Sequence, residues 1–179
     1  MQTTMFDYQP HLTGKVIAMR PTTAQDHAPL FALGSDPAVW DLHPQGDRWK
    51  EGVFRAFFDD GLASGGALTA ICRDTGAVAG WSRYSALYAG AGEIEIGWTF
   101  LGRDYWGGAY NSDMKRIMLD HAFRFVDTVI FRVGEANFRS RRAVEKLGAT
   151  LTDRAMAMDT PAGTSLNLYY AITRETFEG

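Results

Sequence analysis

The residues with the clearest chemical meaning form a turn at positions 103–111, with the sequence Arg-Asp-Tyr-Trp-Gly-Gly-Ala-Tyr-Asn. An alternating, strand-like segment at 92–101 precedes this turn, and a strongly helical segment follows it. A turn of small residues between a strand and a helix exposes backbone N–H groups at the positive end of the helix dipole, and such a group of donors binds phosphate. We therefore expect a phosphate-bearing ligand at this turn.

Three kinds of phosphate loop were compared with the turn. A P-loop requires Gly-Lys followed by Ser or Thr, whereas Gly108 is followed here by Ala109 and Tyr110. A dinucleotide fingerprint lies early in a parallel sheet and needs an acidic residue about 20 positions later, but this turn follows a series of hairpins. The third kind, the pyrophosphate loop of a coenzyme A enzyme, agrees with the order of the elements.

The elements around the turn follow from hydrophobic periodicity and from turn residues. Short turns favour antiparallel hairpins, and the strand–turn–helix–strand unit implies that segments 92–101 and 128–134 run parallel. The predicted fold class is therefore α/β (α+β): a mixed sheet of about seven strands, an antiparallel meander followed by a βαβ crossover, with about four helices. The predicted strands are 15–20, 67–73, 77–86, 92–101, 128–134, 150–159 and 164–173, and the predicted helices are 24–33, 49–62, 109–126 and 138–147.

Length and composition exclude several classes of protein. A chain of 179 residues suits one domain; residues 1–13 read as a loosely held arm before a domain at 14–179. The net charge of −3 argues against nucleic-acid binding, and the absence of a long apolar run argues against a membrane span. The single Cys72 cannot form an intramolecular disulfide, and no secretory signal is visible, so a cytoplasmic location is expected. No metal site is predicted.

Two stretches together resemble a known family. The segment Trp106-Gly107-Gly108-Ala109-Tyr110 and the later run from Asn137 through Glu145-Lys146-Leu147-Gly148 are similar to the GNAT superfamily of N-acetyltransferases, and the order of elements is similar to its RimJ/RimL-like branch. The resemblance covers about residues 14–174. It departs from the family pattern where Gly108 replaces the usual lysine and Ala109 replaces the second glycine. It implies acetyl-CoA as cofactor and direct attack by a primary amine in a ternary complex.

The resemblance also implies where the coenzyme binds. Backbone N–H groups of the turn would hold its diphosphate, and the edge of strand 92–101 would hydrogen-bond its pantetheine arm like an added strand. For Asn137 the residues leave an alternative open, because its side chain could instead cap helix 138–147. The expected cofactor-binding residues are Trp98, Thr99, Phe100, Arg103, Gly107, Gly108, Ala109, Tyr110, Asn111, Asn137 and Ser140.

Strict alternation along 92–101 would place Ile94, Ile96, Trp98 and Phe100 on one face of the sheet, with Glu93, Glu95, Gly97 and Thr99 on the other. Either Glu95 or Glu93 is the expected catalytic base, because an ammonium must lose a proton before it attacks; a solvated carboxylate is the alternative. Trp40, His43 and Tyr84 are the expected substrate-binding residues.

The acceptor itself is left open as a peptide N-terminus or a small-molecule amine. A catalytically silent acyl-CoA sensor is the alternative function, because the fold family's usual tyrosine acid has no counterpart in the expected region. A homodimer could form through sheet edges or through the aromatic helix 49–62.

Overall fold

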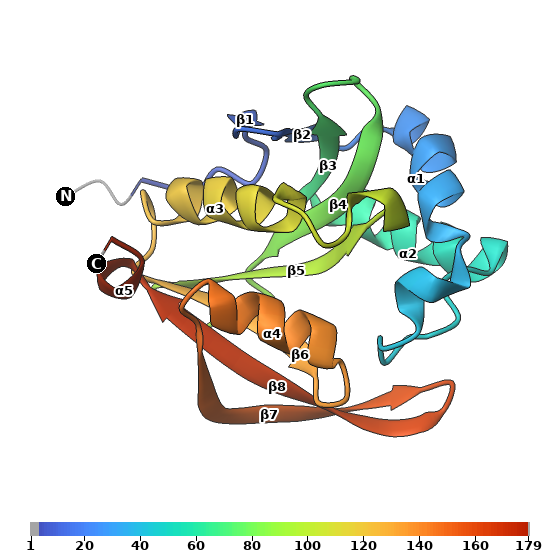
Figure 1. The fold of residues 1–179 in the computed structure, drawn as a ribbon. Helices are drawn as coiled ribbons and strands as arrows, with labels where there is room; N and C mark the ends of the chain where they lie inside the picture. Colours follow the sequence, from blue (N-terminus) through green and yellow to red (C-terminus); the bar gives the residue numbers. More distant parts are fainter. Residues whose placement is uncertain (1–3, 179) are drawn as a thin grey trace.

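The computed structural model describes residues 4–178, and its centre is a mixed sheet of eight strands (Figure 1). The spatial order of the strands is β1-β2-β3-β4-β5-β6-β8-β7. All neighbouring strands are antiparallel except β5 and β6, which run parallel as the βαβ pattern predicts. The strands are β1 (Leu12–Thr13), β2 (Ile17–Pro21), β3 (Ala67–Cys72), β4 (Val78–Ser85), β5 (Glu93–Leu101), β6 (Thr128–Gly134), β7 (Thr150–Thr160) and β8 (Gly163–Thr173).

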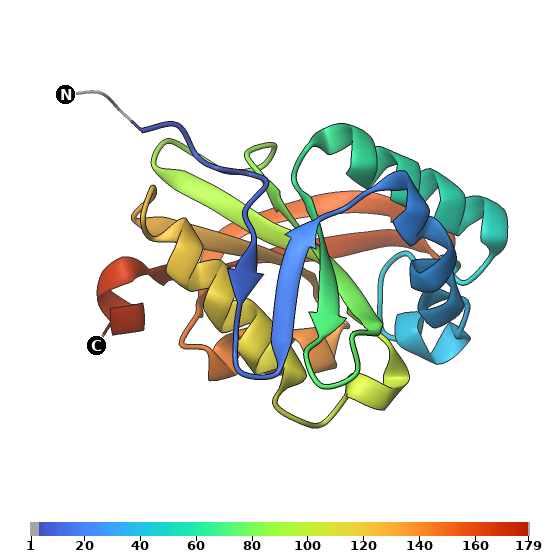
Figure 2. The same ribbon diagram turned by 90° about the horizontal axis from the view of Figure 1, so that it is seen from above.

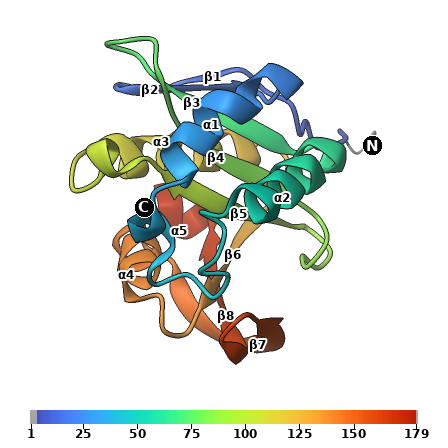
Figure 3. The same ribbon diagram turned by 90° about the vertical axis from the view of Figure 1, so that its right-hand side faces the viewer.

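Helices cover both faces of this sheet (Figures 1 and 3). On one face α1 (His27–Gly34) and α2 (Glu51–Ser64) bury an aromatic cluster that includes Phe54, Phe58 and Trp81. On the other face α3 (Tyr110–Ala122) and α4 (Phe138–Lys146) pack on the aliphatic core. Because the aromatic face of α2 is buried against the sheet, it is not available for the dimer contact that the sequence suggested. A short α5 (Arg174–Glu178) ends the described chain, and 3₁₀ turns occupy Ala24–Asp26, Pro37–Trp40 and Arg103–Tyr105.

The fold class predicted from the sequence is confirmed, with three differences in detail. The strand β1 and the helix α5 were not expected, since two and five residues are too short for a periodic signal. The helix expected at 24–33 begins as a 3₁₀ turn and becomes α1. No helix within residues 4–178 is long and apolar enough to cross a membrane.

The parallel pairing of β5 and β6 is short. It joins Glu93, Ile94 and Glu95 to Thr128, Val129 and Ile130 and then stops. Beyond this point β6 remains paired with β8 as far as Gly134, while β5 remains paired with β4 as far as Leu101. The sheet therefore opens between the carboxyl ends of β5 and β6, next to the turn that leads into α3.

A β-bulge at Trp98 changes the face on which the end of β5 packs. Trp98 has a φ of 51°, and the register with β4 shifts between Trp81 and Arg83. Ile96 lies in the core beneath α3, whereas Phe100 packs in the aromatic cluster of the opposite face. The expectation of strict alternation along 92–101 is therefore wrong, because an extra residue in a bulge reverses the two faces of a strand.

The described part of the N-terminal segment is packed against the domain. The ring of Phe6 contacts those of Tyr84 and His121, at centroid distances of 5.0 and 5.7 Å, and residues 12–13 pair with β2. Figure 2 shows these first strands beside α3. A loosely held arm is therefore the wrong description from Phe6 onward, while the first three residues of that prediction lie outside the described chain.

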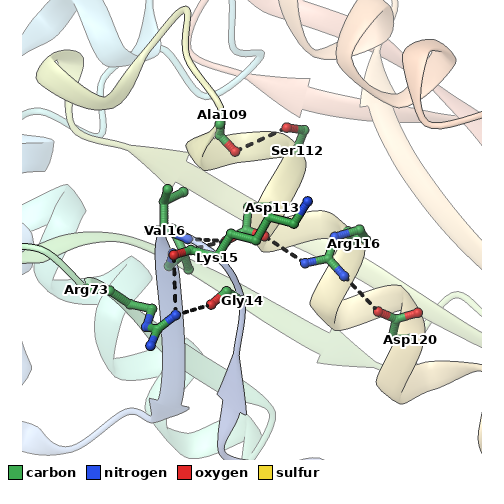
Figure 4. A network of polar contacts seen from close by, with 10 residues as sticks. Gly14, Lys15, Val16, Arg73, Ala109, Ser112, Asp113, Arg116 and Asp120 are labelled. Carbon is green, nitrogen blue, oxygen red and sulfur yellow. Dashed lines mark hydrogen bonds and ion pairs between the residues drawn. The ribbon is translucent and has the colours of Figure 1, made fainter.

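Asp113 ties the start of α3 to the beginning of β2 (Figure 4). Its Oδ2 accepts hydrogen bonds from the N–H groups of Val16 and Ile17, at 2.8 and 3.0 Å, and Arg116 donates to its Oδ1 at 2.8 Å. Burial alone would raise the pKa of Asp113, but the backbone donors around Val16 and the Arg116 guanidinium lower it to about 2. Asp113 thus anchors α3 to β2 one turn after the start of the helix, close to the turn at 103–111 where we expect a phosphate to bind.

Candidate active site

A cavity of about 480 Å³ lies where β5 and β6 separate. Its wall is formed by the ends of these two strands, the first turns of α3 and α4, and the segment at 43–48. Both Gly107 of the small-residue turn and Glu95 of β5 line it. One continuous space therefore joins the expected phosphate site to the expected base.

The turn before α3 presents free backbone donors to this cavity. Within the described chain, the N–H groups of residues 107–112 have no hydrogen-bond acceptor, and the helical pattern begins with Asp113 donating to Ala109. Gly107 has a φ of +72°, a conformation that favours glycine. A Cβ on Gly108 would meet nothing closer than the ring of Tyr110 at 3.8 Å. The backbone is thus bare toward the cavity, as an anion-binding turn requires.

Of the other cofactor-binding residues expected at the turn and on β5, some line the cavity and some do not. Asn111 lines the cavity, as do Trp98, Thr99 and Phe100 of β5. Ala109 and Tyr110 do not line it; the ring of Tyr110 instead packs on Tyr105 at a centroid distance of 5.1 Å. These two residues could act at the turn through their backbone alone.

Asn137 and Ser140 begin α4 at the opposite wall of the cavity. The side-chain oxygen of Asn137 accepts a hydrogen bond from the N–H of Ser140 at 3.3 Å, so Asn137 caps the helix, which was the alternative considered for it. Its location at the cavity wall is also consistent with a ligand contact through its amide nitrogen, which the cap does not use.

Arg103 points away from the cavity. Its guanidinium forms two hydrogen bonds with the carboxylate of Asp36, at 2.7 and 2.6 Å, and it does not line the cavity. Asp36 also accepts the N–H of Ala38 and so caps the 3₁₀ turn that follows. This arrangement gives no support to the expected phosphate contact of Arg103, because its guanidinium already binds a carboxylate that is distant in the sequence.

The two candidate bases have different surroundings. Glu93 lies outside the cavity, where Arg154 donates to it at 3.0 Å, so its position gives no support to a catalytic role. Glu95 lines the cavity with 1% of its surface exposed, and its Oε1 accepts from Arg132 Nε at 3.1 Å. Its Oε2 is buried and has no partner among the described residues. Burial raises the pKa of Glu95, in spite of the nearby Arg132 and Arg83 cations.

The three expected substrate-binding residues are also separated by the structure. His43 lines the cavity, its Nδ1 accepts the N–H of Gln45 at 3.0 Å, and burial lowers its pKa well below the usual value. Trp40 is buried behind the cavity wall and donates to the carbonyl of Gly34. Tyr84 is buried beneath α3 and donates to the carbonyl of Met118 at 2.6 Å. The positions of Trp40 and Tyr84 therefore give no support to a substrate contact, because both are core residues that do not line the cavity.

Three cations on the cavity wall were missed from the sequence: Lys115, Arg48 and Arg132. Lys115 is buried, its Nζ donates to Thr99 Oγ1 at 2.6 Å, and burial lowers its pKa to about 7. A signal for it existed, because Asn111 and Lys115 are four residues apart and so share one face of α3. For the two arginines there was no local signal, because a loop and a strand that are far apart in sequence bring them to the wall of one cavity.

Comparison with known proteins places this arrangement in a family. The chain matches the family model of the acetyltransferase (GNAT) domain over residues 17–150, most of its length. This chain belongs to the GNAT acetyltransferases. The prediction of an acyltransferase enzyme is thereby confirmed. No curated protein matches its sequence.

Solved structures of GNAT proteins share the fold at low sequence identity. A GCN5-related N-acetyltransferase from Brucella melitensis superposes with a TM-score of 0.83 at 17% identity, covering 95% of this chain and 81% of that one. A GNAT-family acetyltransferase from Bacillus anthracis gives 0.77 at 20% identity, covering 93% and 99%. Mycobacterium smegmatis RimJ, in complex with CoA-disulfide, gives 0.70 at 16% identity, covering 93% and 87%.

Proposed function

We propose that this GNAT protein transfers an acetyl group from acetyl-CoA to a primary amine by direct attack, with both substrates in the cavity between β5 and β6. The single observation that carries the proposal is the continuity of this cavity. It joins a turn of free N–H groups at Gly107 and Gly108 to a buried carboxylate, Glu95, whose Oε2 has no partner in the described part of the chain.

The residues present agree with the chemical groups of coenzyme A. The turn at 107–112 offers consecutive N–H donors at the start of a helix, which suit a diphosphate. The unpaired edge of β5 beyond Glu95 could hydrogen-bond an extended pantetheine arm, as an added strand would. Asn137 and Ser140 stand on the facing wall. A RimJ structure that contains a CoA-disulfide has the same fold, which supports this choice of ligand.

Acetyl-CoA would supply an acetyl group activated as a thioester, and the protein would supply position and a base. An acceptor amine reaches neutral solution as an ammonium, so it must release a proton before its lone pair can attack. Glu95 Oε2 is the buried acceptor for that proton, and its raised pKa makes Glu95 a stronger base than an exposed glutamate. Arg132 holds the other oxygen and orients the carboxylate.

The direct test is release of free CoA thiol from acetyl-CoA in the presence of a panel of primary amines. We expect amine-dependent release that saturates with both substrates. Coenzyme binding without release for any amine would favour the acyl-CoA sensor instead. A RimJ/RimL-like branch and a cytoplasmic location stay predictions. So does a homodimer, for which the sheet edges are the remaining candidate surface.

A further inference from the structure

An excess of positive charge, carried by one buried and two half-buried arginines, lies at the cavity wall near Glu95. Arg132 and Arg48 line the cavity, and Arg83 lies next to them beneath the ring of Trp98, at 3.7 Å from its guanidinium carbon to the ring centroid. Glu95 is the buried carboxylate among them, while Asp60, which pairs with Arg83, is 74% exposed. Charges removed from water are normally paired, so this excess of cations over carboxylates indicates a place for an anion.

Arg48 is the clearest case of a cation without a partner. Its guanidinium stacks on the ring of Phe57 at 4.1 Å, and its only polar contact in the described chain is His43 Nε2 at 3.3 Å. Because His43 Nδ1 accepts the N–H of Gln45, the proton of its neutral ring is on Nε2, which then cannot accept from Arg48. Burial and the charge of Arg83 lower the pKa of Arg48 to about 9. The N–H groups of Arg48 thus lie at the cavity wall, and no oxygen of residues 4–178 accepts a hydrogen bond from them.

The other two arginines also have unused donors. Arg132 gives its Nε to Glu95, but Nη1 has only the sulfur of Met158, at 3.7 Å. Nε and Nη2 of Arg83 are buried without any partner within residues 4–178. The ring of Tyr88 covers the guanidinium of Arg132, with 3.7 Å between the guanidinium carbon and the ring centroid. Aromatic rings therefore hold both Arg83 and Arg132 in place before a ligand binds. Fixed guanidinium groups recognise anionic oxygens, above all carboxylates and phosphates.

We infer that the acceptor is a small amine that also carries an anionic oxygen group, which Arg48 and Arg132 bind while the amine faces Glu95. This inference rests on the proposed function, whose substrate class it narrows. One cavity of about 480 Å³ holds both the arginines and the coenzyme end of the site, and this favours a compact, amino-acid-like acceptor over a long peptide. The anionic group of the acceptor balances the excess positive charge of the arginines. Binding of that group to Arg48 and Arg132 then orients the amine of the same molecule toward Glu95.

The test measures binding, so that it does not depend on turnover. Calorimetry in the presence of CoA compares N-acetylated amino acids, which mimic the product, with their carboxamides and with N-acetylated aminoalkylphosphonates. We expect at least one acid to bind about tenfold or more tightly than its carboxamide. A stronger phosphonate would assign the anion as phosphate-like and a stronger carboxylate as carboxylic, and either result supports the anion site.

Variants at Arg48 locate the effect. Arg48→Gln should abolish the preference for the anion, Arg48→Lys should keep most of it, and Arg55→Gln should leave it unchanged, since Arg55 is an exposed residue of α2 that pairs with Asp59. Equal affinity for acids and carboxamides, a preference that survives in Arg48→Gln, or no binding of any probe would overturn the inference. Absence of acetyl transfer together with a clear anion preference would contradict the proposed function only.

Discussion

Glu95 and Arg132 share one hydrogen bond, 3.1 Å long, which occupies a single oxygen of the carboxylate; the other oxygen is buried and has no partner within residues 4–178. The two residues come from adjacent strands just where their parallel pairing ends. Arg132 therefore fixes the carboxylate of Glu95 at the point where the sheet opens, beside the cavity that we assign to the reaction.

Replacement of Glu95 by glutamine should remove the base and keep the shape of the site. We expect Glu95→Gln to lower kcat by about 100-fold or more, with the affinity for acetyl-CoA unchanged. In the native enzyme the rate should rise with pH through the raised pKa of Glu95, and this acid limb should disappear in the variant. Steady-state rates between pH 5 and 9 measure both effects.

Glu93→Gln is the matched control, because Glu93 precedes Glu95 on the same strand but pairs with Arg154 outside the cavity. Its kcat should change by less than about threefold, as expected for a partly exposed ion pair. A loss in Glu93→Gln as large as in Glu95→Gln would show that the base is misassigned.

Arg103 was expected from the sequence to contact a phosphate, and its pairing with Asp36 predicts otherwise. In Arg103→Gln the dissociation constant for acetyl-CoA should stay within about twofold of the native value, because an exposed ion pair contributes little. Calorimetric titration provides the measurement. A tenfold weaker affinity, with the fold intact by circular dichroism, would restore the phosphate contact.

The Asp113 anchor should contribute to stability in a pH-dependent way. Asp113→Ala leaves the N–H groups of Val16 and Ile17 without their acceptor and should lower the free energy of unfolding by about 2–3 kcal/mol. The pKa of Asp113 falls from 3.8 to about 2 on folding, so its contribution is complete above pH 4 and is lost as the pH falls toward 2.

Urea unfolding at pH 7 and at pH 3 measures the contribution of Asp113. The exposed Asp120, which also pairs with Arg116, provides the control: Asp120→Ala should change stability by less than about 0.5 kcal/mol. A difference between native protein and Asp113→Ala that does not shrink at pH 3 would contradict the anchor.

Lys115 should also make stability rise with pH, but in a higher pH range than Asp113. Burial lowers its pKa from 10.5 to about 7, so the unfolded chain binds more protons than the folded protein between these values. Stability then rises with pH across this range, by up to about 1.4 kcal/mol per unit. Lys115→Met should remove that slope and should be more stable than the native protein at pH 7. An identical slope in both proteins would show that Lys115 titrates normally.

The sequence was sufficient for the fold because the strands and helices carry clear periodic signals, and the small-residue turn was recognisable by its chemistry. The errors lie where distant segments meet. Alternation failed at Trp98, because a bulge that pairs with β4 reverses the faces of β5. Glu93 and Glu95 looked equivalent until the packing of Arg154 and Arg132 separated them. The partner of Arg103 is 67 residues away and no local pattern could show it.

The central claim is that free N–H groups at residues 107–112 bind the diphosphate of acetyl-CoA. Gly108→Asp adds a carboxylate where a Cβ meets only the ring of Tyr110, in ordinary contact at 3.8 Å, so its charge would lie beside the bound diphosphate. Gly52→Asp is the matched control on α2, at another glycine with no atom close to its Cβ.

Calorimetric titration of acetyl-CoA into the native protein and both variants is the deciding measurement. We predict saturable binding to the native protein and to Gly52→Asp, with affinity at least about tenfold weaker in Gly108→Asp, as expected when like charges meet at a binding site. No binding to the native protein, or equal binding to all three, would contradict the claim.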